Sequence, residues 1–272
     1  MKFFASHLKH LGMSDHTLES YLFTVRKYLA EYDEITKKNL AAYRSDLIDR
    51  YAPKTVNIRI AAMNTYMKYL KKETFLMKNV KVQQKPFLEN VICEADYAFL
   101  KKSLKKDGNT RMYFMVWFLA ATGARVAEFV KLKAEHVRAG HVDLYGKGGK
   151  MRRIYIPKKL RTEALLWLDG LGRDTGYLFV DERRRGSEKN AHLSTRGVTQ
   201  ALQSAGRKYG IEKAVMHPHS FRHLFGKMFF ERTKDLALLA DLMGHESIDT
   251  TRIYTRRTAT EQRALVDEVV TW

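Results

Sequence analysis

The segment "HPHSFRH" (residues 217–223) sets three histidines and one arginine around a single proline. Proline has a fixed φ and no backbone N–H, so it fits the first turn of a helix. If Pro218 opens a helix, His219 and Arg222 lie three residues apart and share one of its faces. A histidine and an arginine that face the same way can handle a phosphate group.

The length and the charge of the chain indicate two domains and an anionic partner. The chain has 272 residues, of which 45% are hydrophobic and 29% are charged, so it can bury a real core and is long enough for two domains. Its 49 Lys and Arg outnumber 30 Asp and Glu, which gives a formal net charge of +19. A charge of this size calls for an anionic partner, and nucleic acid is the leading candidate. A basic protein without such a partner is the alternative.

The sequence argues against a membrane protein and against a metal site. The longest apolar run, residues 112–121, is well short of the roughly 20 residues that span a bilayer, and the amino terminus lacks the apolar core of a signal peptide. We therefore expect a cytoplasmic protein. Cys93 is the only cysteine, which excludes an intramolecular disulfide and a Cys-based zinc site. Zinc at His219 and His223 would lack the glutamate of HExxH and a third ligand, so we expect no metal and no cofactor.

The amino-terminal part is expected to be helical. Apolar residues recur at helical spacing in residues 14–32, 36–51 and 52–73. Ser14 is a candidate cap for the first of these helices. Together they predict a small helical domain over residues 1–80. Residues 81–90 are polar, contain Pro86 and show no clear period, which is typical of an exposed linker.

Residues 91–272 form the second predicted domain. Helices are expected at residues 94–104, 111–121 and 125–132. Residues 141–157 then alternate on both sides of a Gly-rich turn, which predicts a β-hairpin with its loop at residues 147–150. The remainder returns to helices. The predicted fold class is mainly α with a small antiparallel β-sheet.

Six residues of the second domain could act together on a phosphate. Each alone has an ordinary explanation, as a surface charge, a solvated lysine in a turn or a tyrosine in the core. Their order and spacing favour a joint function. They are Arg125, Lys147, His219, Arg222, His245 and Tyr254.

The sequence resembles the tyrosine recombinases of the phage integrase family, in their Xer-like form. Four ordered segments carry the resemblance: "TGARVAE" (122–128), "GKGGKMRRIYIP" (146–157), "PHSFRH" (218–223) and "LMGHESIDTTRIYT" (242–255). Further positions match the family's core-binding domain, namely Thr17, Tyr21, Thr55 and Asn57. The resemblance implies a two-domain architecture, with a helical, SAM-like core-binding domain, a mixed α/β catalytic domain and a C-terminal tail helix.

The resemblance also implies a role for each candidate. Arg125 and Arg222 clamp the non-bridging phosphate oxygens, while His219 donates to the phosphate or accepts the nucleophile's proton. His245 is an additional donor to the phosphate. Lys147 is the general acid that protonates the departing 5′ oxygen, and Tyr254 is the nucleophile. Lys150 competes with Lys147 for the acid role. The residues expected to contact the DNA backbone are Lys150, Arg152 and Arg153.

The implied activity is that of a site-specific recombinase or integrase. It cuts and rejoins duplex DNA through a 3′-phosphotyrosyl intermediate and a Holliday junction, without metal or ATP. The implied partners are a duplex with an inverted-repeat core site, possible accessory proteins, and three more copies of the chain in a tetramer on DNA. In that tetramer the tail, with Leu265, Val269 and Trp272 at helical spacing, exchanges between protomers; packing on its own domain is the alternative. Two other functions stay open, a type IB topoisomerase-like strand swivel and a DNA-binding regulator without catalysis.

The sequence departs from the family pattern at two places, and three residues near the candidates have expected roles of their own. Phe221 stands where the family usually has leucine, and no glycine occurs near Thr233, which could alter the end of a helix. Glu128 is expected either to orient an active-site group or to form a plain surface ion pair. His217 and His223 are given structural or DNA-adjacent roles.

Overall fold

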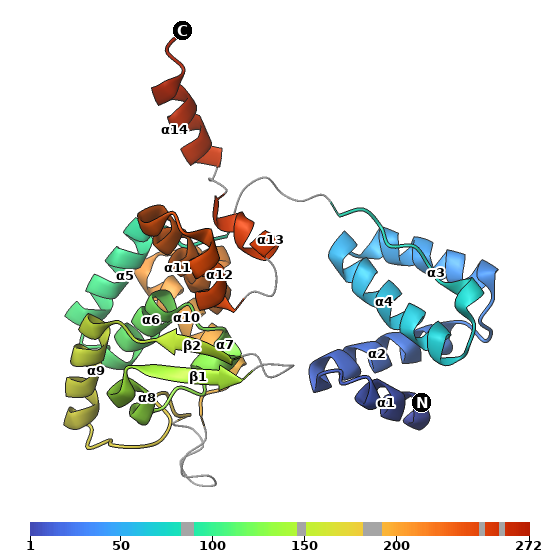
Figure 1. Ribbon diagram of the computed structural model, residues 1–272, viewed down its shortest axis with the longest axis horizontal. Coiled ribbons are helices and arrows are strands. Elements are labelled where there is room, and N and C mark those ends of the chain that lie inside the picture. Colours follow the sequence, from blue (N-terminus) through green and yellow to red (C-terminus); the bar gives the residue numbers. More distant parts are fainter. Residues whose placement is uncertain (83–89, 146–150, 182–191, 245–247, 256–258) are drawn as a thin grey trace. The chain divides into compact units, whose positions relative to one another are not determined.

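The computed structural model describes residues 1–82, 90–145, 151–181, 192–244, 248–255 and 259–272. The chain divides into two compact units, Met1–Gln84 and Lys85–Trp272, and Figure 1 shows the elements of each. This division falls inside the segment that the sequence assigns to a linker.

The first unit is helical. Its elements are α1 (Lys2–His10), α2 (Asp15–Glu31), α3 (Lys37–Arg50), α4 (Pro53–Tyr69) and the 3-10 helix η1 (Glu73–Phe75). The side-chain oxygens of Ser14 and Thr36 accept the N–H groups of Thr17 and Asn39 and so cap α2 and α3. The three predicted helices are confirmed, and α1 is an additional helix that was not predicted. Apolar side chains from α1 to α4 make one buried cluster.

An extended segment after η1 is fastened to α4 by two asparagines. Asn57 donates to the carbonyl of Val80 at 3.0 Å and accepts its N–H at 2.8 Å. Asn64 pairs in the same way with Met77, with both distances 2.9 Å. A side-chain amide offers one donor and one acceptor, so each asparagine replaces a strand partner. The segment up to Val80 is therefore bound to the helices of the first unit.

The second unit is built around α6. Its elements are α5 (Glu94–Lys106), α6 (Thr110–Thr122), α7 (Val126–Phe129), α8 (Ala134–Ala139), β1 (His141–Tyr145), β2 (Met151–Tyr155), α9 (Lys158–Gly170), α10 (Thr195–Tyr209), η4 (Lys213–Val215), α11 (Pro218–Thr233), α12 (Leu236–Met243), α13 (Ile248–Thr251), η5 (Arg252–Thr255) and α14 (Ala259–Val269). Most side chains of α6 are buried, as its almost wholly apolar sequence requires. The helix predicted over residues 125–132 is shorter than expected, since α7 ends at Phe129.

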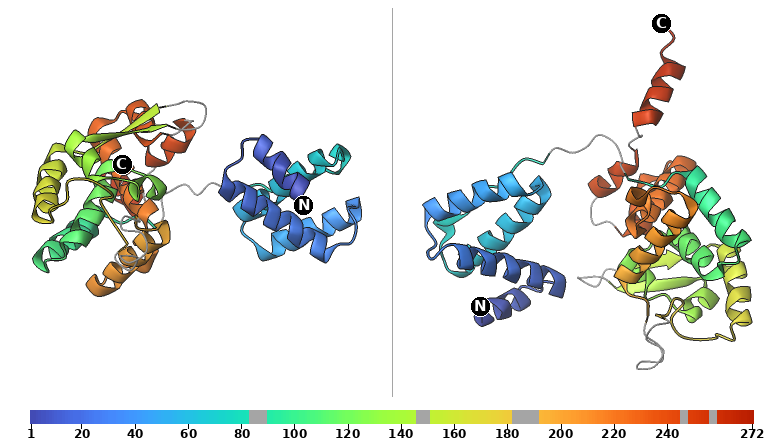
Figure 2. Two further views of the ribbon diagram at one scale, coloured as in Figure 1. Left: turned by 90° about the horizontal axis from the view of Figure 1, so that it is seen from below. Right: turned by 180° about the vertical axis from the view of Figure 1, so that it is seen from behind.

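The predicted β-hairpin is present. β1 pairs antiparallel with β2, from His141 opposite Tyr155 to Tyr145 opposite Met151. β2 also lies against α12 (Figure 2). The hairpin thus brings Arg152 to the end of the helix that carries part of the "LMGHES" segment.

α11 begins at Pro218, as the sequence predicts. The ring of His217 accepts the N–H of Ser220 and caps the helix, and the hydroxyl of Ser220 accepts the N–H of Ile92 at 2.7 Å. Phe221 is fully buried in the core of the second unit, so the family's apolar position is kept. At the other end Lys234 adopts a left-handed conformation with φ of 56°, which is where a glycine is common.

The carboxyl-terminal tail presents an accessible apolar surface. Among residues 262–272 only Leu265 is half-buried, and all the others are exposed. Within the described ranges, no helix of the chain is both long and apolar enough to cross a bilayer.

Candidate active site

Arg222, on α11, lies at the centre of the candidate site. It is 2% exposed and donates through Nη2 to the carbonyl of Met243 at 2.6 Å and through Nη1 to the carbonyl of Gly123. Burial, followed by the positive charges of Arg125 and Arg152, lowers the pKa of Arg222 to about 10. The side chain stays charged at neutral pH, so the site holds a buried cation.

Arg125 lies next to the end of α6, where Gly123 adopts a left-handed conformation with φ of 60°. Its Nη2 donates to the carbonyl of Gly244 at 2.7 Å, and its Nη1 donates to Oε1 of Glu128 at 2.9 Å. Met243 and Gly244 are consecutive, so the two predicted phosphate clamps bind neighbouring carbonyls at the C-terminal end of α12. That end of a helix carries partial negative charge, which favours cations. The structure brings the two arginines together and leaves Arg125 the more exposed one.

Glu128 connects this pair to the β-hairpin. It accepts the backbone N–H of Arg125 at 2.7 Å, and its two oxygens accept Nη1 of Arg152 at 2.8 and 3.0 Å. Burial alone would raise the pKa of Glu128, but the charge of Arg152 and the hydrogen bonds from Arg125 outweigh it and hold the pKa below its ordinary value. Of the two expected roles, these contacts favour orientation of an active-site group.

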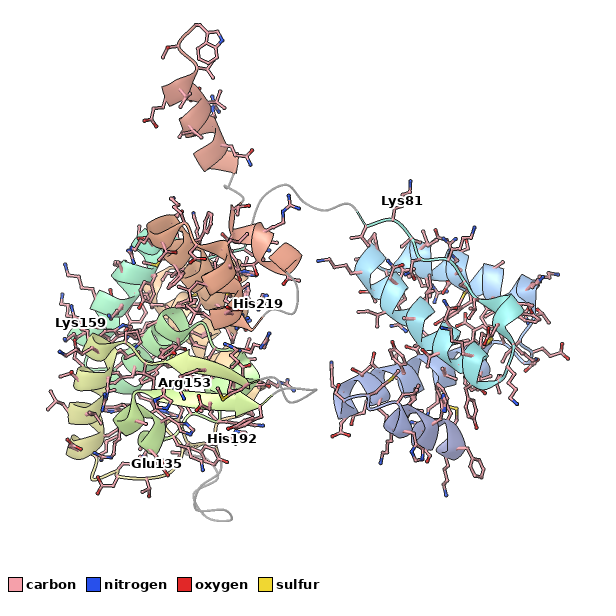
Figure 3. The ribbon with its side chains drawn as sticks, in the orientation of Figure 1. Lys81, Glu135, Arg153, Lys159, His192 and His219 are labelled. Carbon is pink, nitrogen blue, oxygen red and sulfur yellow. The ribbon has the colours of Figure 1, made fainter. Side chains whose placement is uncertain are left out.

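Arg152 and Arg153 are consecutive on β2 and therefore face opposite sides of the hairpin. The side chain of Arg152 is 10% exposed and also donates through Nε to the carbonyl of Leu242 at 2.9 Å. Arg153 pairs across the hairpin with Asp143 through bonds of 2.6 and 2.8 Å, and its side chain is 38% exposed (Figure 3). This burial favours a supporting role for Arg152 over the predicted contact with a DNA backbone, whereas Arg153 is accessible.

His219 lies one helical turn before Arg222 and is exposed (Figure 3). Loss of hydration lowers the pKa of His219, and the charges of Arg222, His217 and Arg125 lower it further. The imidazole is therefore neutral at neutral pH, with one nitrogen that donates and one that accepts. It can serve a phosphate held by the two arginines.

Tyr254, on η5, is 3% exposed. It belongs to an apolar cluster with Leu239 and Met243, against which phenylalanines of α11 pack. Its ring rests on Gly226, where an added Cβ would lie 2.5 Å from the ring. Burial raises the pKa of Tyr254 strongly, and the charges of Arg222 and Arg125 offset only part of that rise. The phenol of the predicted nucleophile is thus enclosed by apolar side chains.

His223, for which the sequence indicated only a structural or DNA-adjacent role, contacts the phenol. Nδ1 of His223 lies 3.1 Å from the hydroxyl of Tyr254. The only sequence signal is the place of His223 directly after Arg222 on the same helix. Three predicted residues, Lys147, Lys150 and His245, lie outside the described residues.

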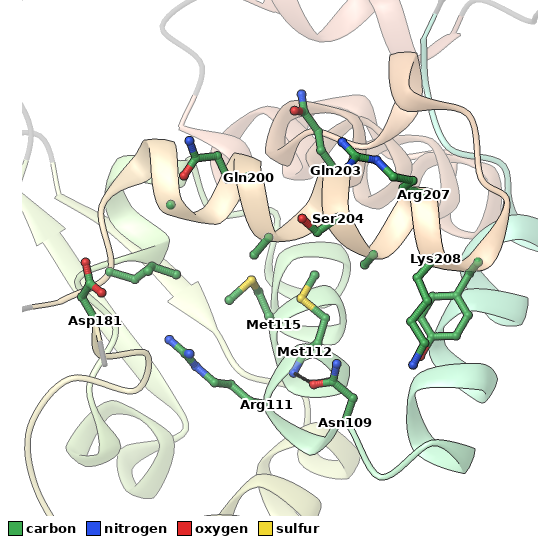
Figure 4. A pocket seen from close by; sticks show the side chains of 15 residues that line it. Asn109, Arg111, Met112, Met115, Asp181, Gln200, Gln203, Ser204, Arg207 and Lys208 are labelled. Carbon is green, nitrogen blue, oxygen red and sulfur yellow. Dashed lines mark hydrogen bonds between the residues drawn. The ribbon is translucent and has the colours of Figure 1, made fainter. Parts of the chain in front are cut away.

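A separate cavity of about 770 Å³ lies between α6 and α10 (Figure 4). Its lining includes Met112 and Met115 of α6 and Ser204 of α10, and it includes none of the described candidate residues. Among the described residues, no group of three or more His, Cys, Asp or Glu is arranged to hold a metal ion.

Comparisons with known proteins agree with this geometry. The sequence pattern of the phage integrase family matches residues 91–261. The tyrosine recombinase XerA of Pyrococcus furiosus is 33% identical over 270 residues, which cover 97% of this chain and 91% of that protein. A crystal structure of XerA recombinase aligns with a TM-score of 0.55 and 25% identity, over 97% of this chain and 95% of that one. XerH site-specific recombinase bound to its difH substrate aligns with a TM-score of 0.68 and 19% identity, over 94% and 79% of the two chains. This chain belongs to the phage integrase family and is a Xer-like tyrosine recombinase.

Proposed function

We propose that this chain is a site-specific recombinase that cuts and rejoins duplex DNA, with Tyr254 as the nucleophile. The phenol oxygen attacks the phosphorus, the 5′ oxygen leaves with a proton, and a 3′-phosphotyrosyl bond stores the energy of the broken ester. A 5′ hydroxyl of the partner duplex then reverses the step, and two rounds of exchange pass through a Holliday junction. Neither a metal nor ATP is required.

The observation that carries this proposal is the pair of arginines at the end of α12. Arg125 and Arg222 bind the consecutive carbonyls of Met243 and Gly244, so their guanidiniums lie together on one acceptor surface. Guanidinium forks stabilise the charge that builds up on phosphate oxygens in the transition state. The tyrosine is packed on the same helix that carries one of the two arginines.

Two roles rest on the resemblance. We assign Lys147 as the acid that protonates the leaving 5′ oxygen, with Lys150 as its alternative, and His245 as a further phosphate donor. Contact of Lys150 and Arg153 with the DNA backbone belongs to the same proposal. The net charge of +19 supports a duplex as the substrate.

The assembly is proposed as a homotetramer on an inverted-repeat core site, with exchange of the C-terminal helix between protomers and possible accessory proteins. Exposed apolar side chains on the tail support such docking, namely Val266, Val269, Val270 and Trp272. A cytoplasmic location stays a prediction of the sequence.

The test is capture of a covalent adduct. The protein is incubated, in the presence of EDTA, with a library of inverted-repeat duplexes that carry a nick near the centre, and DNA that becomes linked to protein is sequenced. We expect an adduct at Tyr254 and one enriched site, and no adduct from Tyr254→Phe. Relaxation of supercoiled plasmid without a specific site would favour the topoisomerase function, and a Tyr254→Phe protein that performs like wild type would favour the regulator.

A further inference from the structure

Two histidines of α11 face two different chemical groups. His219 is exposed and lies near the charges of Arg222 and Arg125. His223 is half-buried, and its Nδ1 lies 3.1 Å from the hydroxyl of Tyr254, with the two rings 5.5 Å apart. The resemblance left two roles open for His219, donation to the phosphate or acceptance of the nucleophile's proton. The structure instead puts His219 beside the arginines and His223 beside the phenol.

The buried phenol needs a proton acceptor in contact with it. Enclosure of Tyr254 among apolar side chains stabilises the protonated phenol over the phenolate. A phenol that stays protonated can attack phosphorus only if its proton is taken up as the new bond forms. An imidazole with its proton on Nε2 presents a lone pair at Nδ1, which is the nitrogen of His223 that meets the hydroxyl.

The position of His223 on the helix suits this role. Its Nδ1 meets the hydroxyl of Tyr254, and the charges of Arg222 and Arg125 act on the same phenol, so the phenol lies within electrostatic reach of both clamps. The rings of His219 and His223 lie 4.3 Å apart at an interplanar angle of 79°. Gly226, one turn beyond Arg222, leaves room for the ring of Tyr254. α11 therefore carries one of the two phosphate clamps, the imidazole and the glycine on which the ring of the nucleophile packs.

We infer that His223 is a catalytic residue that accepts the proton of Tyr254 during strand cleavage and returns it during rejoining. The inference rests on the proposed function. As the phenol oxygen bonds to phosphorus, its proton moves to Nδ1 of His223; the bond to the 5′ oxygen breaks, and that oxygen takes its proton from the general acid. Rejoining reverses each transfer, so atoms and charge balance over the cycle.

The experiment compares His223→Asn and His223→Ala with a matched control. Asparagine places an amide oxygen near the position of Nδ1, so it keeps a hydrogen-bond acceptor that cannot be protonated. The control is His136→Asn, since His136 is also half-buried and its Nδ1 also accepts a hydrogen bond, from the N–H of Lys133 at 3.2 Å. All proteins are assayed on the nicked duplex selected by adduct capture. Cleavage is measured in single turnover, with thermal unfolding and DNA affinity alongside.

We expect both His223 variants to bind DNA as wild type does and to cleave about 10²- to 10⁴-fold more slowly, with His136→Asn unchanged. A second duplex carries sulfur in place of the leaving 5′ oxygen, and this leaving group needs no proton. The defect of His223→Asn should persist on that duplex, because the missing step is on the nucleophile's side.

Two results would overturn the inference and leave the proposed function intact. One is a wild-type cleavage rate for His223→Asn, which would mean that His223 only holds the phenol. The other is full recovery of His223→Asn on the sulfur duplex, which would place His223 on the leaving-group side. Absence of any adduct with the wild-type protein would instead contradict the proposed function.

Discussion

Replacement of Glu128 by glutamine should destabilise the second unit and misplace Arg125. The side chains of Glu128 and Arg152 are 18% and 10% exposed, and two bonds of 2.8 and 3.0 Å join them. Removal of one partner from a buried ion pair typically costs about 3–5 kcal/mol, because the other charge stays buried. Glutamine keeps one acceptor oxygen, so we expect about 3 kcal/mol. For a domain of this size that corresponds to a fall in Tm of about 6–12 °C.

The measurement is unfolding followed by circular dichroism, with two comparisons. Asp174→Asn breaks a pair with Arg138 in which the side chains are 84% and 40% exposed, and it should cost under about 1 kcal/mol. Glu128→Gln combined with Arg152→Met replaces both buried charges and should recover most of the lost stability. Cleavage should still be about 10- to 100-fold slower in the double variant, because the charged carboxylate that orients Arg125 is gone.

The same pair gives a pH dependence. The pKa of Glu128 lies below its ordinary value of 4.5 in the folded protein, so its contribution is present above that value and is lost as the pH falls through the folded pKa. Glu128→Gln should therefore flatten the acid side of the stability curve. A loss for Glu128→Gln no larger than that for Asp174→Asn would refute the reasoning, as would a double variant no more stable than the single one.

Three further outcomes are expected. Gly226→Ala should displace the ring of Tyr254, since the added Cβ would lie 2.5 Å from it. Mass spectrometry after treatment with a nitrating reagent should then find Tyr254 modified faster than in the wild type. An unchanged rate of modification would contradict the packing of Tyr254 on Gly226. Ser220→Ala should lower the free energy of unfolding by about 1–3 kcal/mol in urea titration, because it orphans the buried N–H of Ile92, and a neutral result would mean that water replaces the hydroxyl. Affinity for a duplex should fall by about 10³-fold or more between 50 and 200 mM salt if six or more phosphates are contacted, and a flat response in a filter-binding assay would argue against a phosphate-dominated interface.

The sequence predicted those parts of the fold that depend on local pattern. Ser14 and Thr36 cap the helices that apolar spacing marks, and Pro218 opens α11, because caps and helix starts depend on residues a few positions apart. The pairing of Glu128 with Arg152 joins residues 24 positions apart. Which face of β2 turns inward depends on its packing against α12. Alternation in the sequence alone therefore could not show that Arg152 is buried and that Arg153 is accessible.

The site was predicted in part for the same reason. Four of the six candidates lie within the described residues, and the structure gathers Arg125, His219, Arg222 and Tyr254 around α11 and the end of α12. The contact of His223 with Tyr254 spans 31 positions and needs the fold of η5 against α11. Burial of the phenol likewise depends on this packing, which no spacing rule in the sequence encodes.

If Arg125 and Arg222 clamp a phosphate as we propose, the carbonyls of Met243 and Gly244 take the place of its oxygens before DNA binds. Because two oxygens of a helix end already orient both guanidiniums, the donors are aligned during folding and need little reorganisation when the substrate binds. A phosphate that enters exchanges one set of acceptors for another, so these contacts add modestly to ground-state affinity. Their effect is largest when negative charge accumulates on the pentacoordinate phosphorus, where a rigid, pre-aligned array lowers the barrier rather than the dissociation constant.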